Sequence, residues 1–255
     1  MRHESIVNLP SIPSAAPSYP NGAFRFVNRE YFIVIYETDP EAISEALPEP
    51  LEPDGSNTVL YEFIRMPDSS GLGDYTESGV IIPSKYSDEP VNYIAQMYLD
   101  NEPAIAAGRE VWGFPKKNGK PTLAVFDDTL TGILEYANIQ VAIGTMTYKH
   151  TNICQNPTQR AEILAKLSKK QVNLKIIPDF DGTPAIAQLI AYRLTDIDIK
   201  GAWTGSARLH LVPHVNAPVA DFPVRKIINC IHIIADLTLP YGTVMYDYLG
   251  QSSSE

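Results

Sequence analysis

The chain has 255 residues, about 44% of them hydrophobic, and its 30 acidic and 20 basic side chains give a formal net charge of −10. This is the composition of a globular protein with a substantial core, and the acidic balance without any long basic run excludes a nucleic-acid-binding role. The two cysteines, Cys154 and Cys230, lie far apart and form neither a zinc pattern nor a disulfide framework.

Residues 1–20 contain four prolines and little hydrophobic periodicity, so we expect an extended N-terminal arm there. The first residues show no signal-peptide pattern, and no stretch is apolar for long enough to form a membrane helix. We therefore expect a cytoplasmic protein without a membrane partner. Because neither a repeat nor a linker follows the arm, we predict a single domain over residues 1–255.

Strand-type alternation dominates the chain from residue 24 onward. The predicted strands cover residues 24–36, 58–66, 75–82, 92–99, 121–126, 132–137, 140–148, 172–177, 185–194, 197–200, 207–212 and 227–239. The first of them is predicted to be a strand pair or one bent strand, with Asn28 and Arg29 at its corner. Helical patterns are few and cover residues 40–47, 101–109 and 157–170. We expect a mainly β (α+β) fold, an antiparallel sheet closed into a cone- or barrel-like structure with a few short flanking helices.

Two consecutive lysines, Lys116 and Lys117, directly follow an apolar and aromatic run that ends in Phe114 and Pro115. A lysine in such company is predicted to be partly removed from water, which lowers its pKa and makes the amine a nucleophile near neutral pH. The alternative is a solvated turn with Asn118-Gly119 as the tip of a hairpin.

If the chain is extended at these lysines, neighbouring side chains point to opposite faces, so Lys117 cannot approach the amine of Lys116. Burial in apolar surroundings should then lower the pKa of Lys116 more than a neighbouring cation does. Lys117 is left with a supporting role, such as pairing with an acid on the other face.

Three further residues are candidates for chemistry. Glu62 and Glu77 are carboxylates in otherwise apolar strands, and Arg29 stands at an aromatic corner. His210 and His214 have helical spacing but flank a proline in a strand-like region, so we expect no metal site.

Several motifs, spread in order over nearly the whole chain, resemble the acetoacetate decarboxylase family. They are Asn28-Arg29-Glu30-Tyr31-Phe32, the run from Ser70 to Gly79, the run from Met97 to Ala106, the run from Gly108 to Lys117, Leu174-Lys175-Ile176-Ile177-Pro178, Ala202-Trp203-Thr204-Gly205 and Tyr246-Asp247-Tyr248-Leu249. The resemblance implies decarboxylation of acetoacetate to acetone and carbon dioxide through a lysine Schiff base, with no added cofactor. It also implies a large homo-oligomer.

The positions that match the family motifs imply a role for each candidate residue. Lys116 would attack the ketone, Arg29 would meet the substrate carboxylate or its acidic neighbour, Glu77 would partner Arg29, and Glu62 would be a second acid near the lysine. We favour an Arg29 that Glu77 partly neutralises, because a strong grip on the substrate carboxylate would stabilise the ground state without raising turnover.

The resemblance further implies a substrate pocket formed by Arg29, Phe26, Met97 and Phe114. Some relatives carry a tyrosine in place of Phe114, so a phenol is missing at this position and a longer β-keto acid is a possible substrate. Two other functions are compatible with the residues: a Schiff-base aldolase or dehydratase on the same scaffold, and a non-enzymatic β-barrel that binds small keto acids.

Overall fold

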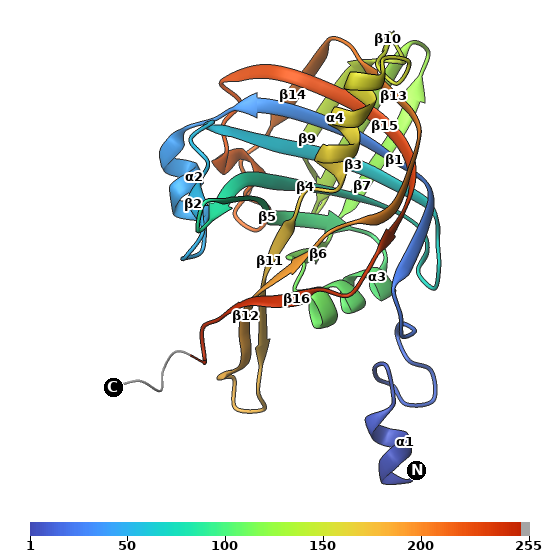
Figure 1. The fold of residues 1–255 in the computed structure, drawn as a ribbon, viewed down its shortest axis with the longest axis vertical. Helices are drawn as coiled ribbons and strands as arrows, with labels where there is room; N and C mark the ends of the chain where they lie inside the picture. The colour runs from blue at the N-terminus through green and yellow to red at the C-terminus, as the bar shows by residue number, and fades with distance from the viewer. Residues whose placement is uncertain (251–255) are drawn as a thin grey trace.

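The computed structural model describes residues 1–250, so the last five residues of the predicted domain lie outside it. This part of the chain forms a large curled sheet and a smaller sheet, with short helices around them (Figure 1). The predicted mainly β content with few short helices is confirmed. The predicted helix over residues 157–170 ends earlier, at Leu167, which leaves Lys169 and Lys170 outside it.

The large sheet contains twelve of the described strands. They are β1 (Phe24–Glu37), β2 (Glu52–Pro53), β3 (Thr58–Ser69), β4 (Gly73–Tyr86), β5 (Glu89–Leu99), β6 (Lys116–Asn118), β10 (Thr151–Asn152), β11 (Gln171–Pro178), β12 (Pro184–Tyr192), β13 (Thr195–Thr204), β15 (Lys226–Leu239) and β16 (Thr243–Asp247). The smaller sheet consists of β7 (Lys120–Phe126), β8 (Thr129–Tyr136), β9 (Ile139–Thr147) and β14 (Ala207–Leu211).

The helical segments are short. They are α1 (His3–Val7), α2 (Pro40–Ala46), α3 (Glu102–Ala107), the π-helix η1 (Gly108–Trp112), α4 (Pro157–Leu167) and the 3₁₀ helix η2 (Val219–Asp221). The sequence predicted an extended arm over residues 1–20, and α1 is a helical turn within that arm. Among residues 1–250 no helix is both long enough and apolar enough to cross a membrane.

The large sheet curls strongly but stays open, so the predicted closed cone or barrel is wrong. Its strand order is β10-β13-β15-β1-β3-β4-β5-β11-β12-β16, and within the described residues no pairing joins the edge strands β10 and β16. The joint between β5 and β11 is also narrow, since only Asn92 with Gln171 and Tyr93 with Val172 are in register there. The ring is not completed, because closure of a barrel requires the two edge strands to pair.

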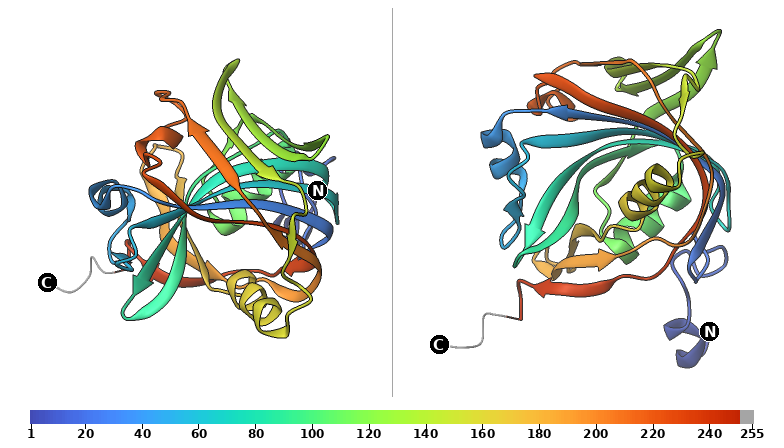
Figure 2. Two further views of the ribbon diagram at one scale, coloured as in Figure 1. Left: turned by 90° about the horizontal axis from the view of Figure 1, so that it is seen from above. Right: turned by 45° about the horizontal axis from the view of Figure 1, so that its top comes forward.

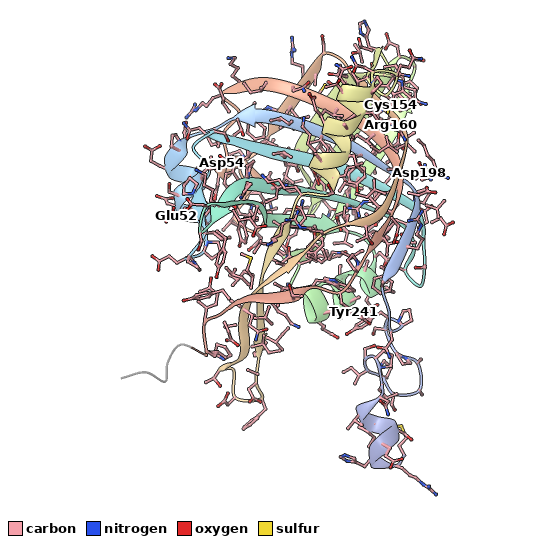
Figure 3. All side chains as sticks on the ribbon, viewed as in Figure 1. Glu52, Asp54, Cys154, Arg160, Asp198 and Tyr241 are labelled. Carbon is pink, nitrogen blue, oxygen red and sulfur yellow. The ribbon has the colours of Figure 1, made fainter. Side chains whose placement is uncertain are left out.

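Helix α4 lies against the concave side of the curled sheet (Figure 2). Ile163 and Leu167 are buried in the core on that side. At its other end, Arg160 lies 4.0 Å from Asp198 of β13 and 3.9 Å from the sulfur of Cys154 (Figure 3). A helix satisfies its own backbone hydrogen bonds, so it covers the sheet without extending the strand ladder.

The two faces of the large sheet belong to two different cores. Along β1, Tyr31 and Ile33 face the concave core, whereas Phe32 and Val34 face the core that lies under the smaller sheet. This is the two-residue alternation expected of a strand that is buried on both sides. The concave core is the one that contains Phe114 and lies around the candidate site.

The bend predicted at Asn28 and Arg29 is confirmed as a feature of one continuous strand. Asn28 has a left-handed φ of 55°, and the register with β15 shifts between Phe26 and Arg29. In a regular strand, residues 26 and 29 would face opposite sides. The bulge places Phe26 and Arg29 on the same concave side, where both line one cavity.

Candidate active site

Lys116 is positioned by the turn that joins α3 to β6. The π-helix η1 follows α3 directly and ends at Trp112, and the next residue, Gly113, has a left-handed φ of 72°. The chain then enters β6, where Lys116 pairs in parallel register with Met97 of β5. Arg109 fixes this turn by donating a hydrogen bond from Nη1 to the Lys116 carbonyl oxygen at 3.1 Å.

Gly108, the first residue of η1, leaves the space that the Lys116 side chain occupies. A Cβ atom at this position would lie 2.6 Å from Cδ of Lys116 and 2.8 Å from Cε. Both distances are shorter than van der Waals contact. A glycine here therefore determines where the lysine side chain can lie.

The Lys116 amine lies inside the protein, next to a carboxylate. Its Nζ is 3.3 Å from Oε2 of Glu77, and the two side chains are only 7% and 4% exposed. It also lies 5.0 Å from the ring centre of Phe114 and 5.8 Å from that of Tyr75. Burial is the main influence on the Lys116 pKa and lowers it, the charge of Arg29 lowers it further, and Glu77 opposes both. The cation that acts on the Lys116 amine is therefore Arg29 and not Lys117.

Lys117 points the other way, as the alternation predicts. Its Nζ donates a hydrogen bond to the carbonyl oxygen of Asn216 at 2.5 Å and lies 5.2 Å from the ring centre of Tyr136. The side chain is therefore paired with a carbonyl and a ring in place of the acid that we expected. The alternative of a hairpin tip at Asn118-Gly119 is wrong, because β6 pairs with β5 and not with β7.

Arg29 lies between aromatic rings. Its guanidinium carbon is 5.1 Å from the ring centre of Phe26 and 4.8 Å from that of Tyr31, and its Nε is buried without a hydrogen-bond partner. Burial is the largest influence and lowers the Arg29 pKa, but Tyr31, Glu77 and other neighbours outweigh it and raise the pKa overall. Among the described residues no ion pair joins Arg29 to Glu77, whose carboxylate contacts Lys116 instead.

Glu62 is the second carboxylate of the site. It lies on β3 opposite Ile33 of β1 and Gly79 of β4, and its side chain lines the same cavity as Lys116. Burial raises the pKa of Glu62 to about 7; Arg29 partly offsets this effect, and Glu77 adds to it. A carboxyl group with this pKa is present in both protonation states near neutral pH, so it can accept and return a proton.

One cavity of about 300 Å³ brings the predicted residues together. Lys116, Arg29, Glu62 and Glu77 line it, and so do the three residues predicted to bind substrate, Phe26, Met97 and Phe114. Lys117 does not. Trp112, two residues before Phe114, does not line the cavity either. Its indole nitrogen donates a hydrogen bond to the carbonyl oxygen of Pro240, and its ring stacks on that of Tyr241, which is labelled in Figure 3, with ring centres 5.7 Å apart.

Three tyrosines in this cavity were missed from the sequence: Tyr31, Tyr75 and Tyr192. Strand alternation could have found the first two, because Tyr31 is two residues after Arg29 and Tyr75 two residues before Glu77. Tyr192 ends β12 and meets Phe114 edge-on, with ring centres 5.4 Å apart. The cavity therefore contains a phenol beside Phe114, supplied by another strand.

Lys166, Lys169 and Gln171 also line the cavity, and because Lys166 is exposed and Lys169 half-buried, they form its outer end. Burial lowers the pKa of the Lys169 ammonium, and the charge of Asp54 opposes this effect. Oε1 of Gln171 is buried without a hydrogen-bond partner. Two cations thus stand at the outer end of the cavity in a chain whose formal charge is −10. Within residues 1–250 no three His, Cys, Asp or Glu side chains form a cluster that could hold a metal ion.

Fold and cavity together are those of a curled β-sheet protein with a lysine and a carboxylate buried side by side. The model of the family "Acetoacetate decarboxylase (ADC)" matches residues 9–249, and the chain belongs to this family. A protein named acetoacetate decarboxylase from Acidiphilium cryptum is 51% identical over 94% of this chain and 95% of its own length. A protein of the same name from Paraburkholderia xenovorans is 51% identical over 96% of this chain and 94% of its own length.

Solved structures agree with this assignment. A structure described as acetoacetate decarboxylase is 44% identical and covers 98% of this chain and 100% of its own, with a TM-score of 0.93. Acetoacetate decarboxylase from Legionella pneumophila is 47% identical and covers 95% of this chain and 94% of its own, with a TM-score of 0.89. The enduracididine biosynthesis enzyme MppR, at 17% identity and a TM-score of 0.78, shares the fold.

Proposed function

We propose that this protein is a carboxy-lyase that converts acetoacetate to acetone and carbon dioxide through a Schiff base on Lys116. One observation carries the proposal: a lysine amine is buried in a cavity, its pKa is lowered mainly by that burial, and it lies 3.3 Å from a buried carboxylate. An ordinary lysine, with a pKa of about 10.4, is neutral in roughly one molecule in a few thousand at pH 7. Burial increases that fraction, and the neutral amine is the form that reacts.

The reaction begins when the neutral amine of Lys116 attacks the ketone carbon of acetoacetate. Proton transfer and loss of water leave a protonated imine. The electrons of the bond to the carboxylate carbon then move toward the imine nitrogen, which releases carbon dioxide and leaves an enamine. Protonation of the terminal enamine carbon and hydrolysis of the imine give acetone and regenerate Lys116. One proton is consumed for each substrate molecule.

The carboxylates supply and accept these protons. Glu77, at 3.3 Å from Nζ, is placed to exchange protons with the Lys116 nitrogen during imine formation and hydrolysis. Glu62, whose pKa burial raises to about 7, has a protonated form at neutral pH that can donate to the enamine carbon. Arg29 supplies positive charge in the same cavity and orients the anionic substrate without an ion pair to Glu77.

The size of the cavity bears on the substrate. Its volume of about 300 Å³ is at the lower end of the range for pockets that hold drug-sized ligands. Acetoacetate, with seven non-hydrogen atoms, leaves space in such a cavity. The proposal therefore includes β-keto acids with a longer apolar chain as slower or comparable substrates.

Product analysis combined with reductive trapping tests this function. The protein should release carbon dioxide and acetone from acetoacetate, and borohydride added during turnover should leave an isopropyl group on Lys116 and inactivate it. Lys116→Met should abolish both results, and Lys120→Met, which changes an exposed lysine nearby, should abolish neither. Trapping without gas release would favour an aldolase or dehydratase, and neither trapping nor gas release would favour a keto-acid-binding protein.

Two further expectations belong to this proposal. We propose that the protein acts in the cytoplasm and assembles as a homo-oligomer. Exposed apolar side chains on the N-terminal arm, Ile6, Val7 and Ile12, are available for contacts between subunits. Sedimentation of the full-length protein, compared with a variant in which these three residues are changed to serine, tests the assembly.

A further inference from the structure

Of the three tyrosines that line the cavity, Tyr75 lies against the Lys116 amine, and within the described residues the other two have hydroxyls without a hydrogen-bond partner. Tyr31 of β1 is 3% exposed, and its hydroxyl oxygen is buried without a hydrogen-bond partner. Tyr192, at the end of β12, is 9% exposed, and no hydrogen bond to its hydroxyl is found among residues 1–250. Both side chains line the cavity that contains Lys116.

The two hydroxyls come from different walls of the cavity but share one electrostatic environment. Strands β1 and β12 are separated by β3, β4, β5 and β11 in the order of the sheet, and its curl brings them together. Arg29, Glu62 and Glu77 act on the pKa of both phenols, and Tyr31 also acts on that of Tyr192. Both hydroxyls are therefore close to the charges that surround the reacting lysine.

At neutral pH the hydroxyls of Tyr31 and Tyr192 are uncharged hydrogen-bond donors. Burial raises the pKa of both phenols far above the ordinary value, so each hydroxyl keeps its proton. The hydroxyl of Tyr31 is a buried donor without an acceptor, which is unfavourable, and a bound ligand that offers an acceptor removes this cost. The buried Nε of Arg29, also without a partner, lies in the same part of the cavity. The cavity thus contains three hydrogen-bond donors that have no protein acceptor among the described residues and that an anionic ligand could use.

We propose that the hydroxyls of Tyr31 and Tyr192 form a neutral carboxylate-binding pair that holds the β-keto acid while Lys116 reacts with its ketone. This inference rests on the proposed function and adds the groups that position the substrate. Hydrogen bonds from neutral donors are weaker than those from a cation. They orient a carboxylate without the firm grip that would stabilise it against leaving as carbon dioxide.

The test uses Tyr31→Phe and Tyr192→Phe, each of which removes one hydroxyl and keeps the ring. With acetoacetate, the KM of each variant should rise about 3- to 10-fold, the range expected for the loss of one neutral hydrogen bond, and kcat should change less. Acetone serves as a second probe because it forms the same imine but has no carboxylate. Borohydride trapping of acetone on Lys116 should stay within about twofold of the unmodified protein.

The matched control is Tyr93→Phe, which removes a buried phenol hydroxyl outside the cavity and should leave both readings unchanged. Melting temperatures of all three variants establish that the fold is intact. An unchanged KM in both cavity variants would overturn the proposal. So would a parallel fall in acetone trapping, because the hydroxyls would then act on the lysine and not on the carboxylate. If the unmodified protein neither releases carbon dioxide nor traps acetone, the proposed function itself fails.

Discussion

The Nζ of Lys116 lies 3.3 Å from Oε2 of Glu77, and both side chains are almost completely buried. Two opposing effects meet at this contact. Burial and the charge of Arg29 lower the pKa of the lysine, whereas Glu77 raises it. The contact therefore preserves part of the lysine's basicity, and in the proposed reaction it provides a group for proton transfer.

Glu77→Gln should lower the pKa of Lys116 further, because the substitution removes the negative charge that opposes burial. Turnover should nevertheless fall by about 100-fold or more, since the proton-transfer group is lost. The rate of borohydride trapping with acetone, measured against pH, reports the pKa through its acid limb. If the acid limb of this profile moved to higher pH, the pKa of Lys116 would have risen, which would contradict the assigned role of Glu77.

Lys117→Met should leave the lowered pKa of Lys116 in place, because Lys117 faces Asn216 and Tyr136 and does not enter the cavity. We expect a loss of about 1 kcal/mol in stability from the missing hydrogen bond. Trapping against pH and urea denaturation measure the two quantities. A Lys116 pKa that returns to the value of free lysine would show that the neighbouring cation, and not burial, activates the amine.

Glu62→Gln should change how stability depends on pH. Burial raises the pKa of Glu62 from 4.5 to about 7, so the folded protein holds a proton between these pH values that the unfolded chain releases. Stability contributed by this proton is present below about pH 4.5 and is lost as the pH rises to 7. Thermal melts should show a smaller decline across this window in the variant. An identical decline would mean that Glu62 ionises normally.

Gly108→Ala should reduce activity by about 10-fold or more, because the new methyl group would lie 2.6 Å from Cδ of Lys116 and displace its amine. Gly250→Ala is the matched control, since its nearest neighbours would lie at an ordinary 3.6 Å. Initial rates and melting temperatures of the two variants give the comparison. Full activity in Gly108→Ala would show that the lysine reaches its substrate by another path.

Lys169→Met should lower kcat/KM for acetoacetate about two- to fivefold at low ionic strength, because it removes a cation from the outer end of the cavity in an acidic protein. The difference should disappear at about 0.5 M salt, where charges are screened over a few ångströms. Lys120→Met is the control, because Lys120 is exposed and does not line the cavity. A deficit that persists at high salt would assign Lys169 a structural role.

Local rules were sufficient for several features of the site. Strand alternation separated Lys116 from Lys117, and the aromatic corner located the bend at Asn28. The same rules placed Glu62 among apolar neighbours. Each of these features depends on residues that are close in the chain, where backbone geometry determines which way a side chain points. The resemblance to the family motifs added the roles expected of Lys116, Arg29 and the two glutamates.

Tertiary structure decided which of these groups meet. The contact of Glu77 with Lys116, the approach of Tyr192 to Phe114 and the position of Lys169 at the cavity depend on how far the large sheet curls and where α4 lies. The parallel joint between β5 and β11, with two register pairs, likewise brings together strands that are far apart in the chain. These relationships join strands that are distant in sequence. No local periodicity encodes them, because they arise from the twist and packing accumulated over the whole sheet.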